Sequence, residues 1–375
     1  MMKIVFTAQD FAFGSVGPLL YLIEEFRNTK DFELIFVGFG TSLQLARKFP
    51  FNEVYELDIE DPKNLSKLED IISKCDAVVS CMDLASIKIA KKHNKITIYE
   101  DVLFWFWPSI SDELFDVDLY IRERTFYSSA NDNLYVDKIK NLLTVGPIMA
   151  KSKKLPRKKQ AFISFGGAQA THVYKVGKDT NFPFVMTDIL SKYVDWSDFE
   201  RVILATNEKT VEELKKRFAN TPFEFTTLAH DKFVSEMSQS EVILITPGLI
   251  TARGAFYTET PVVYLPPSND SQYIQLDGFN GLGLAKASVH LKEFFPELNL
   301  LHLPGEESMR LVLEQLRLLE KSEDVQRKIG LELNDLVKNR NEWSNEMVKK
   351  GKDYIDSLGG NGVDLAIEKI KELLK

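Results

Sequence analysis

The stretch EVILITPGLITARG (241–254) decides the fold, because a short apolar run changes at a Pro-Gly pair into a helical pattern. The run EVILI (241–245) is typical of a strand buried on both faces of a sheet. After Gly248 no charged side chain occurs until Arg253. A helix that follows a strand so directly, with so bare a first turn, has N–H groups that suit an anion.

The same strand-to-helix pattern occurs in two series along the chain. The first series predicts strands at 3–8, 34–39, 53–57, 76–82, 95–100 and 119–123, with helices at 18–28, 42–48, 63–73 and 84–92. The second predicts strands at 160–167, 201–206, 223–228, 241–248 and 262–267, with helices at 183–193, 208–219, 231–239 and 250–259. Such alternation predicts an α/β fold with two Rossmann-like, doubly wound parallel-sheet domains facing a cleft.

A basic segment that contains proline separates the two series. TVGPIM (144–149) is followed by KSKKLPRKK (151–159), and helical patterns fill the chain after 306. We expect an N-terminal domain at 1–149 and a C-terminal domain at 150–340. Helices at 341–375, interrupted by two glycines at 359–360, are expected to cross back to the first domain.

Composition sets broad limits on function. The chain has 375 residues, a net charge of −8 and two cysteines in apolar surroundings. The charge disfavours a nucleic acid polymer as partner, and the cysteines favour a reducing compartment. The start, MMKIVFTAQD, lacks a signal-peptide pattern, and no apolar run is long enough to span a membrane. We therefore expect a cytoplasmic protein; its oligomeric state is left open.

Three turns of the second series carry candidate ligand groups, since ligands bind beyond the carboxyl ends of parallel strands. SFGGAQATH (164–172) and TPGL (246–249) offer backbone N–H groups to a phosphate. VVYLPPSNDSQYIQ (262–275) gathers polar side chains that suit sugar hydroxyls. The simpler interpretation of each is a tight turn or a polar loop. None matches the phosphate loop of ATPases, and GSVG (14–17) is no dinucleotide fingerprint.

Two turns of the first series also carry candidate ligand groups. TAQDFAFGSVGPLL (7–20) places Gln9, Asp10 and Gly14 after a strand, although its glycines would also simply close a turn. YEDVLFWFWPS (99–109) places Asp101 beside Trp105 and Trp107. The default interpretation of that aromatic run is helix or strand core, and peripheral contact with a membrane is a further alternative. Its aromatic rings would stack on a sugar or a base, and a carboxylate beside them would serve as a general base.

Together these stretches resemble the nucleotide-sugar glycosyltransferases of the GT-B architecture. The pattern is most similar to UDP-glucuronosyl/glucosyl transferases and to the peptidoglycan lipid-intermediate N-acetylglucosaminyltransferase. VGPI (145–148) resembles the domain junction of that family, FISFGG (162–167) its glycine turn, and residues 241–272 its donor block. The resemblance implies these donor-binding residues: Gly166, Gly167, Gln169, Thr246, Gly248, Thr251, Asp270 and Gln272.

Two positions depart from the family pattern. Gly254 stands where the family has a glutamate that binds the ribose, and Gln9 and Asp10 stand where many members have a histidine base. DFAFG and the aromatic run also resemble, less closely, the bacterial cytosylglucuronate synthases, which glycosylate a free pyrimidine base.

The resemblance implies an inverting, metal-independent glycosyltransferase that needs no cofactor beyond its nucleoside diphosphate-sugar, expected to be a UDP-sugar. The acceptor would be a small molecule, with a nucleobase as one candidate, and Asp10 or Asp101 would remove its proton. The N-terminal domain at 1–149 would carry the acceptor side, and the C-terminal domain at 150–340 would bind the nucleotide-sugar donor. Acceptor contacts are expected from Gln9, Gly14, Trp105 and Trp107. The alternatives are a sugar-nucleotide hydrolase or epimerase of the same fold, and a non-catalytic nucleotide-sugar-binding protein.

Overall fold

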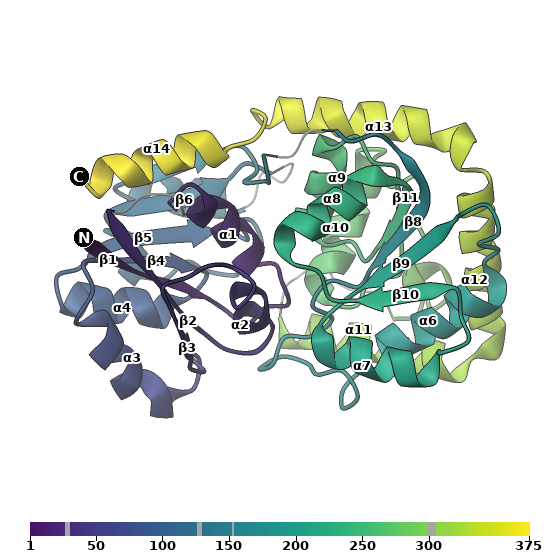
Figure 1. Cartoon of the computed structure of the whole chain (residues 1–375), viewed down its shortest axis with the longest axis horizontal. Coiled ribbons are helices and arrows are strands. Elements are labelled where there is room, and N and C mark those ends of the chain that lie inside the picture. Colours follow the sequence, from purple (N-terminus) through teal and green to yellow (C-terminus); the bar gives the residue numbers. More distant parts are fainter. Residues whose placement is uncertain (27–30, 126–129, 152–153, 299–304) are drawn as a thin grey trace. The chain divides into compact units, whose positions relative to one another are not determined.

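The computed structural model describes residues 1–26, 31–125, 130–151, 154–298 and 305–375. The chain divides into two compact units (Figure 1): Met1–Lys151 with Asp356–Lys375, and Ser152–Ile355. Residues 341–355, which we expected to leave the second domain, therefore belong to the second unit. Only the segment from Asp356 onward joins the first unit. Within the described residues no helix is long and apolar enough to cross a membrane.

The first unit contains a seven-stranded sheet of order β3-β2-β1-β4-β5-β6-β7, and all neighbouring strands are parallel. Its strands are β1 (Met2–Ala8), β2 (Phe32–Gly38), β3 (Glu53–Glu56), β4 (Ala77–Cys81), β5 (Ile96–Asp101), β6 (Leu119–Glu123) and β7 (Leu142–Val145). Its α-helices are α1 (Val16–Glu24), α2 (Gly40–Ala46), α3 (Leu65–Ile72), α4 (Leu84–Lys92), α5 (Ala130–Tyr135) and α14 (Val363–Leu373). Short 3₁₀ turns lie at Pro62–Asn64, Asp112–Leu114 and Val136–Lys138.

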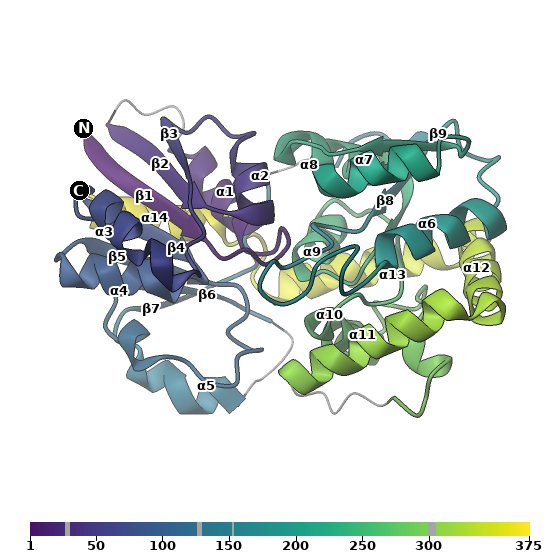
Figure 2. The same ribbon diagram turned by 90° about the horizontal axis from the view of Figure 1, so that it is seen from below.

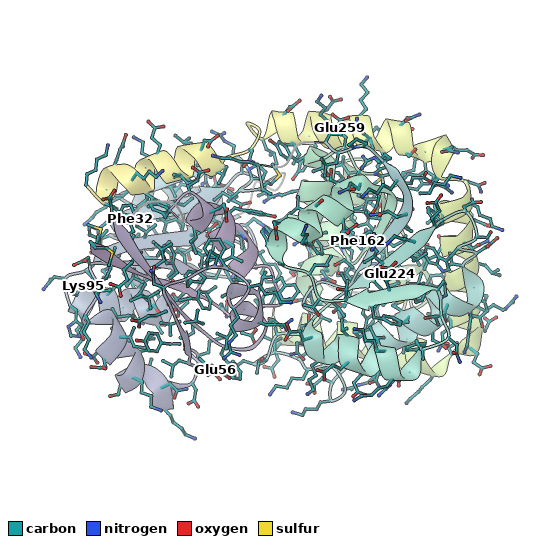
Figure 3. The ribbon with its side chains drawn as sticks, in the orientation of Figure 1. Phe32, Glu56, Lys95, Phe162, Glu224 and Glu259 are labelled. Carbon is teal, nitrogen blue, oxygen red and sulfur yellow. The ribbon has the colours of Figure 1, made fainter. Side chains whose placement is uncertain are left out.

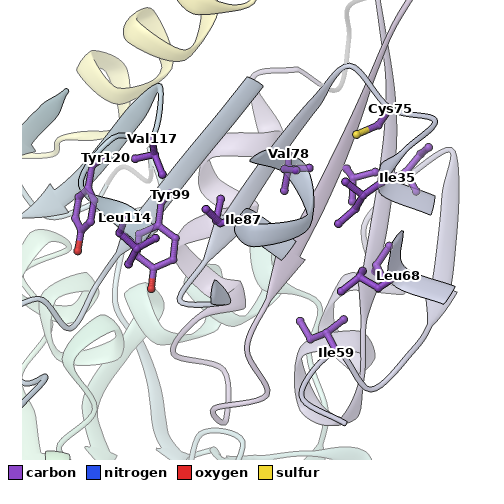
Figure 4. Close-up of a cluster of buried hydrophobic side chains, with 14 of the residues drawn as sticks. Ile35, Ile59, Leu68, Cys75, Val78, Ile87, Tyr99, Leu114, Val117 and Tyr120 are labelled. Atoms are coloured by element: carbon purple, nitrogen blue, oxygen red, sulfur yellow. The ribbon is translucent and has the colours of Figure 1, made fainter. Parts of the chain in front are cut away.

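Helices cover both faces of this sheet, as its apolar strands require. In Figure 1, α1 and α14 lie on one face, and α3 and α4 lie on the other. Figure 4 shows the core on the α3 and α4 side, a cluster that includes Val78 and Tyr99 from the sheet and Leu68 and Ile87 from the helices. Side chains one residue further along each strand point to the α1 side.

The second unit contains a five-stranded parallel sheet of order β10-β9-β8-β11-β12. Its strands are β8 (Lys158–Ser164), β9 (Arg201–Ala205), β10 (Phe223–Thr226), β11 (Ser240–Ile245) and β12 (Val262–Tyr264). Its α-helices are α6 (Phe182–Tyr193), α7 (Glu208–Arg217), α8 (His230–Gln239), α9 (Leu249–Tyr257), α10 (Asp270–Gly281), α11 (Glu306–Lys321), α12 (Glu323–Lys338) and α13 (Arg340–Ser357), with a 3₁₀ turn at Leu291–Glu293.

Both faces of the second sheet are also packed. Phe162, labelled in Figure 3, is fully buried in β8 and meets Phe233 of α8 edge to face, with ring centroids 5.1 Å apart. Helix α6 packs with α7, α11 and α12 (Figure 2). The contact between α6 and α12 is close, since a Cβ on Gly330 would lie 2.4 Å from Cβ of Tyr193.

Glycines allow the C-terminal segment to lie against the end of β7. A Cβ on Gly146 would lie 2.2 Å from the carbonyl oxygen of Gly360, and one on Gly362 would lie 2.1 Å from that of Gly146. The N–H of Gly362 donates to the carbonyl of Pro147 at 2.9 Å. The VGPI segment is therefore where the returning chain contacts the first unit, and α14 then packs on α1 and β7.

The structure confirms the predicted fold class and every predicted strand run, with shifts of a few residues at the ends. The largest shifts are at 160–167, 241–248 and 262–267, whose strands end three residues earlier, at Ser164, Ile245 and Tyr264. The default interpretation of the aromatic run as helix or strand is wrong: β5 ends at Asp101, and a hydrogen-bonded turn follows. Its apolar side chains are still mostly buried, because the turn folds onto the sheet.

Candidate functional site

The glycine turn after β8 is held in place at the carboxyl edge of the second sheet. The side-chain amide of Asn207, which follows β9, donates to the carbonyl of Gly167 at 2.8 Å. The hydroxyl of Thr206 donates to the carbonyl of Gly166 at 3.0 Å. Gly166 has φ +60°, and a Cβ there would meet nothing within 4 Å. The turn therefore presents backbone, without side-chain cover, to open space.

The start of α9 has the bare first turn that the sequence predicts. Gly248 is the N-cap residue and supplies no side-chain cap, and the first turn has no acidic residue. The first backbone N–H with a helical acceptor is that of Ala252, which donates to Gly248 at 3.0 Å. Among the described residues, the N–H groups of Leu249, Ile250 and Thr251 meet no acceptor. They form a compact set of donors at the positive end of the helix dipole.

The start of α10 lies beside that of α9. Gln272 accepts hydrogen bonds at Oε1 from the N–H and hydroxyl of Ser268, at 2.8 and 2.9 Å. Its Nε2 donates to the hydroxyl of Thr246 at 3.4 Å. Asn269 caps α10 by accepting from the N–H of Gln272 at 2.9 Å. The turn after β11 and the first turn of α10 are thus joined through side chains.

Asp270 is the one acid in the first turn of α10. Its Oδ1 accepts from the N–H of Ser271 at 2.9 Å and its Oδ2 from the N–H of Gly305 at 3.4 Å. Burial raises the pKa of Asp270, and these hydrogen bonds oppose the rise. The residue is 9% exposed at the edge of the sheet, so its carboxyl group is held rather than mobile.

Gly254 does not face open space. A Cβ at this position would lie 3.3 Å from Cε of Met237 in α8. This side of α9 is therefore covered by a methionine, and no acid of α9 lies in its first turn. The position of the departure noted at Gly254 is therefore occupied by the side chain of Met237.

Asp10 lies at the carboxyl edge of the first sheet, after β1. Its Oδ1 accepts from both the N–H and the hydroxyl of Thr41, at 2.7 and 2.6 Å. Gly40, with φ +60°, makes room for it, because a Cβ there would lie 2.2 Å from Oδ2 of Asp10. The residue is 5% exposed, and its carboxylate is fixed against the start of α2.

Asp101 ends β5 and is surrounded by donors from its own unit. Oδ1 accepts from the N–H of Leu103 and the indole of Trp107, at 2.9 and 3.0 Å. Oδ2 accepts from the hydroxyl of Tyr120 at 2.6 Å. Burial raises the pKa of Asp101, while the hydrogen bonds from Tyr120 and Trp107 lower it. Both oxygens are engaged in holding the aromatic turn.

The aromatic turn is also held from α5. The side-chain amide of Asn131 donates to the carbonyls of Phe104 and Trp107, at 2.7 and 2.8 Å. Trp105 and Trp107 are half-buried, and Trp105 packs edge to face on Phe106 with centroids 5.4 Å apart. The two tryptophans are placed by different contacts, and only the indole N–H of Trp107 binds Asp101.

Gln9 and Gly14 occupy the loop between β1 and α1. The side-chain amide of Gln9 donates to Glu60 at 3.0 Å, and its backbone N–H donates to the carbonyl of Cys81 at 3.1 Å. The N–H of Gly14 donates to the carbonyl of Phe11 at 3.0 Å, which closes a turn. Gly14 thus helps to close a turn, which is the simpler of the two interpretations given above.

Comparison with known proteins places this architecture. No family model matches the sequence, and no curated protein matches it. Solved structures match over almost the whole chain. The spinosyn rhamnosyltransferase SpnG has a TM-score of 0.55 at 9% identity, covering 100% of this chain and 99% of that one. The glycotransferase of kitacinnamycin has 0.55 at 12%, covering 99% and 98%. A ugt transferase from Siraitia grosvenorii in complex with UDP has 0.51 at 10%, covering 100% of both.

The chain has the GT-B glycosyltransferase fold. At these identities the likeness shows the fold, and the reaction has to be argued from the site. In this GT-B chain, six of the expected donor residues come together at one edge of the second sheet: Gly166, Gly167, Thr246, Gly248, Asp270 and Gln272. Gln169 and Thr251 are half-buried in the same turns.

The acceptor-side candidates are less closely grouped. Asp10 follows β1 and Asp101 ends β5, and β4 lies between those strands. Residues that sequence reasoning missed include Asn207, Asn131 and Tyr120, each of which holds a candidate residue or its turn by a hydrogen bond. Asn207 had a readable signal, because an asparagine directly before a helical pattern is a common N-cap.

Proposed function

We propose that this GT-B protein is an inverting, metal-independent glycosyltransferase that uses a nucleoside diphosphate-sugar and a small-molecule acceptor. The observation that carries the proposal is the bare start of α9 beside the Thr246–Gln272 hydrogen bond. A set of unpaired N–H donors suits a diphosphate, and a fixed amide and carboxylate next to it suit sugar hydroxyls.

The leaving group would be stabilised by backbone donors. As the bond from the anomeric carbon to the diphosphate breaks, negative charge grows on the phosphate oxygens. The N–H groups at Leu249, Ile250 and Thr251, with the turn at Gly166 and Gly167, would donate to those oxygens. Because these donors are already fixed by the fold, they stabilise the diphosphate charge without having to reorient. This is the task that a metal ion would otherwise perform, and it supports the proposal of metal independence.

The acceptor would lose its proton to Asp10. An acceptor O–H or N–H attacks the anomeric carbon from the side opposite the diphosphate, which inverts its configuration, and the carboxylate takes the proton. Asp10 is favoured over Asp101 for two reasons. Asp10 lies in the turn where many members of the resembled family have their base, and three donors already hold the carboxylate of Asp101 in the aromatic turn. Asp101 would instead hold Trp107 for acceptor contact.

The donor is proposed to be a UDP-sugar, and a nucleobase is one acceptor class worth including. UDP and glucose are bound in the solved structure of the Anabaena protein HepE, which matches this chain with a TM-score of 0.50 at 11% identity. That structure is similar to this chain in fold, and its ligands suggest UDP and UDP-glucose as the first compounds to test.

The test is incubation with a panel of UDP- and TDP-sugars, with and without pooled phenol, sugar and pyrimidine acceptors, with products identified by mass spectrometry and NMR. We expect nucleoside diphosphate release that depends on an acceptor, an inverted product, and unchanged rates in EDTA. Release without an acceptor would identify a hydrolase, and an isomerised donor an epimerase. Tight donor binding without turnover would identify a binding protein.

A further inference from the structure

The loop after β8 makes a contact that the proposed reaction does not use. Residues 170–174 form a turn closed by two backbone hydrogen bonds, from Ala170 to Tyr174 at 3.1 Å and from Tyr174 to Ala170 at 2.8 Å. Ala170 and Tyr174 are 1% and 2% exposed, while His172 and Val173 at the tip are exposed. The two ends of the turn are therefore buried in the second unit, and its tip is exposed to solvent.

The Tyr174 side chain reaches the start of α10. Its hydroxyl oxygen accepts a hydrogen bond from Nδ2 of Asn269 at 3.2 Å, across 95 residues of sequence. Asn269 is 4% exposed, so its amide has little access to water as a substitute partner. Tyr174 thus supplies the acceptor that this buried N–H group needs.

The orientation of Asn269 follows from its other partners. Its Oδ1 accepts from the N–H of Gln272 and from the hydroxyl of Ser271, both at 2.9 Å. Only a carbonyl oxygen can accept these bonds, so Nδ2 has to point at Tyr174. The N–H of Gln272 therefore fixes which way the N-cap amide faces, and the hydroxyl of Tyr174 is the acceptor that its Nδ2 then meets.

These contacts form a continuous series from the loop after β8 to the turn after β11. Tyr174 binds Asn269, Asn269 caps the helix at Gln272, and Gln272 binds Thr246. We propose that Tyr174 is a positioning residue for the sugar moiety of the donor, an inference that rests on the proposed function. It acts through Asn269 on the two α10 side chains, Asp270 and Gln272, and not on the N–H donors of α9.

The inference predicts a selective defect. In Tyr174→Phe the buried Nδ2 of Asn269 loses its acceptor, and the first turn of α10 loosens. Affinity for the nucleotide-sugar should fall about tenfold, the size of one lost hydrogen bond, while affinity for UDP alone stays within about twofold. Donor KM should rise more than kcat falls.

Tyr264 offers a matched control. It is fully buried in β12, and among the described residues its hydroxyl has no hydrogen-bond partner. Tyr264→Phe removes the same atom from the same unit, breaks no hydrogen bond within the described chain and keeps the ring that stacks on Phe279 of α10. It should leave the ratio of UDP-sugar affinity to UDP affinity unchanged.

The experiment is calorimetric titration of UDP and UDP-glucose into the wild type, Tyr174→Phe, Tyr264→Phe, Asn269→Ser and the double variant Tyr174→Phe/Asn269→Ser. Serine caps the helix without an amide to satisfy, so adding Tyr174→Phe to Asn269→Ser should change little. An unchanged affinity ratio in Tyr174→Phe, an equal loss for UDP, or additive losses in the double variant would each overturn the inference. Failure of the wild type to bind UDP-glucose more tightly than UDP would instead count against the proposed donor.

Discussion

Gln272, in the first turn of α10, donates a hydrogen bond from Nε2 to the hydroxyl of Thr246 at 3.4 Å, and so joins two turns that follow different strands. The side-chain oxygen of Gln272, Oε1, accepts hydrogen bonds from the N–H and the hydroxyl of Ser268. The amide is thus fixed at the edge where a donor sugar would lie beside its diphosphate.

Replacing Gln272 by alanine should therefore impair sugar binding without unfolding the protein. We expect kcat/KM for the donor to fall at least about tenfold, because a fixed polar partner of the sugar is lost, while UDP affinity is retained. Gln239→Ala at the far end of α8, which removes only a bond to Ser235, is the control. Equal donor kinetics in the two variants would contradict the assignment of Gln272.

Two substitutions at Gly248 separate the effect of a negative charge from the effect of a helix cap. Its backbone is extended, with φ −79° and ψ 130°, and a Cβ there would come no closer than 3.9 Å to another residue. Serine or aspartate should cap α9 and stabilise the fold by a few tenths of a kcal/mol. Gly248→Asp, however, places a negative charge beside the proposed diphosphate.

We expect Gly248→Asp to weaken UDP binding at least about tenfold while raising the melting temperature slightly, and the loss should shrink at high salt. Gly248→Ser has the same cap without the charge and should bind UDP within a few-fold of the wild type. Equal UDP affinities for the aspartate and serine variants would show that no anion binds at the start of α9.

Asp10 and Asp101 should respond differently to the loss of charge. The side-chain amide in Asp10→Asn can still accept from Thr41, so this variant should keep its stability and lose about 10²- to 10⁴-fold in kcat. Asp101→Asn should lower the free energy of unfolding by about 1–3 kcal/mol, because three donors converge on that carboxylate. Steady-state kinetics and chemical denaturation of both variants decide between them. Wild-type turnover in Asp10→Asn, or loss of turnover without loss of stability in Asp101→Asn, would reverse the roles.

Much of the fold is readable in the sequence, since buried parallel strands are short apolar runs and each is followed by a helical pattern. EVILI lies in β11, and Gly248 of the Pro-Gly pair is the N-cap residue of α9. The aromatic run after Asp101 was misread, because strand, helix and buried turn share the same composition. The hydrogen bonds from Leu103 and Trp107 to Asp101, with those from the backbone N–H groups of Phe106 and Trp107 to the carbonyl of Leu103, define it as a turn.

The supporting contacts of the site were out of reach of the sequence. The Tyr174–Asn269 bond joins residues 95 positions apart, and neither lies in a motif that predicts the other. Asp10 was singled out by its place after a strand, but its partner Thr41 follows the next strand and carries no signal of its own. Local sequence patterns predict the helices and strands and where they end. The hydrogen bonds between side chains that follow different strands depend on tertiary packing, which a local pattern does not contain.

Gly254 leads to a prediction about the nucleotide. Because this position has no side chain and is covered by Met237, no acid there can bind the ribose hydroxyls. We expect UDP and 2′-deoxy-UDP to bind with affinities within about twofold of each other, since a lost hydrogen bond would cost more than that. Calorimetric titration of both nucleotides measures the ratio. A preference for UDP of more than about tenfold would show that another group binds the 2′-hydroxyl.

Glu100 leads to a prediction about stability and pH. It lies at the end of β5, completely buried, and neither carboxyl oxygen accepts a hydrogen bond from a nitrogen or oxygen donor among the described residues. Burial, with the nearby carboxylates of Glu123 and Asp101, raises the pKa of Glu100 well above 4.5, and the thiol of Cys81 opposes this in part. The folded chain therefore keeps a proton that the unfolded chain gives up.

Below about pH 4 Glu100 is protonated in both the folded and the unfolded state, so the chain has its full stability with respect to this group. Between the unfolded-state and the folded-state pKa, unfolding releases a proton. The free energy of unfolding therefore falls as the pH rises through this range. Glu100→Gln is neutral at every pH, so it should gain stability relative to the wild type between pH 5 and pH 8, measured as melting temperature. Glu342→Gln, at an exposed position of α13, should follow the wild type. Parallel pH profiles for the wild type and Glu100→Gln would show that Glu100 ionises in the folded protein as it does in the unfolded chain.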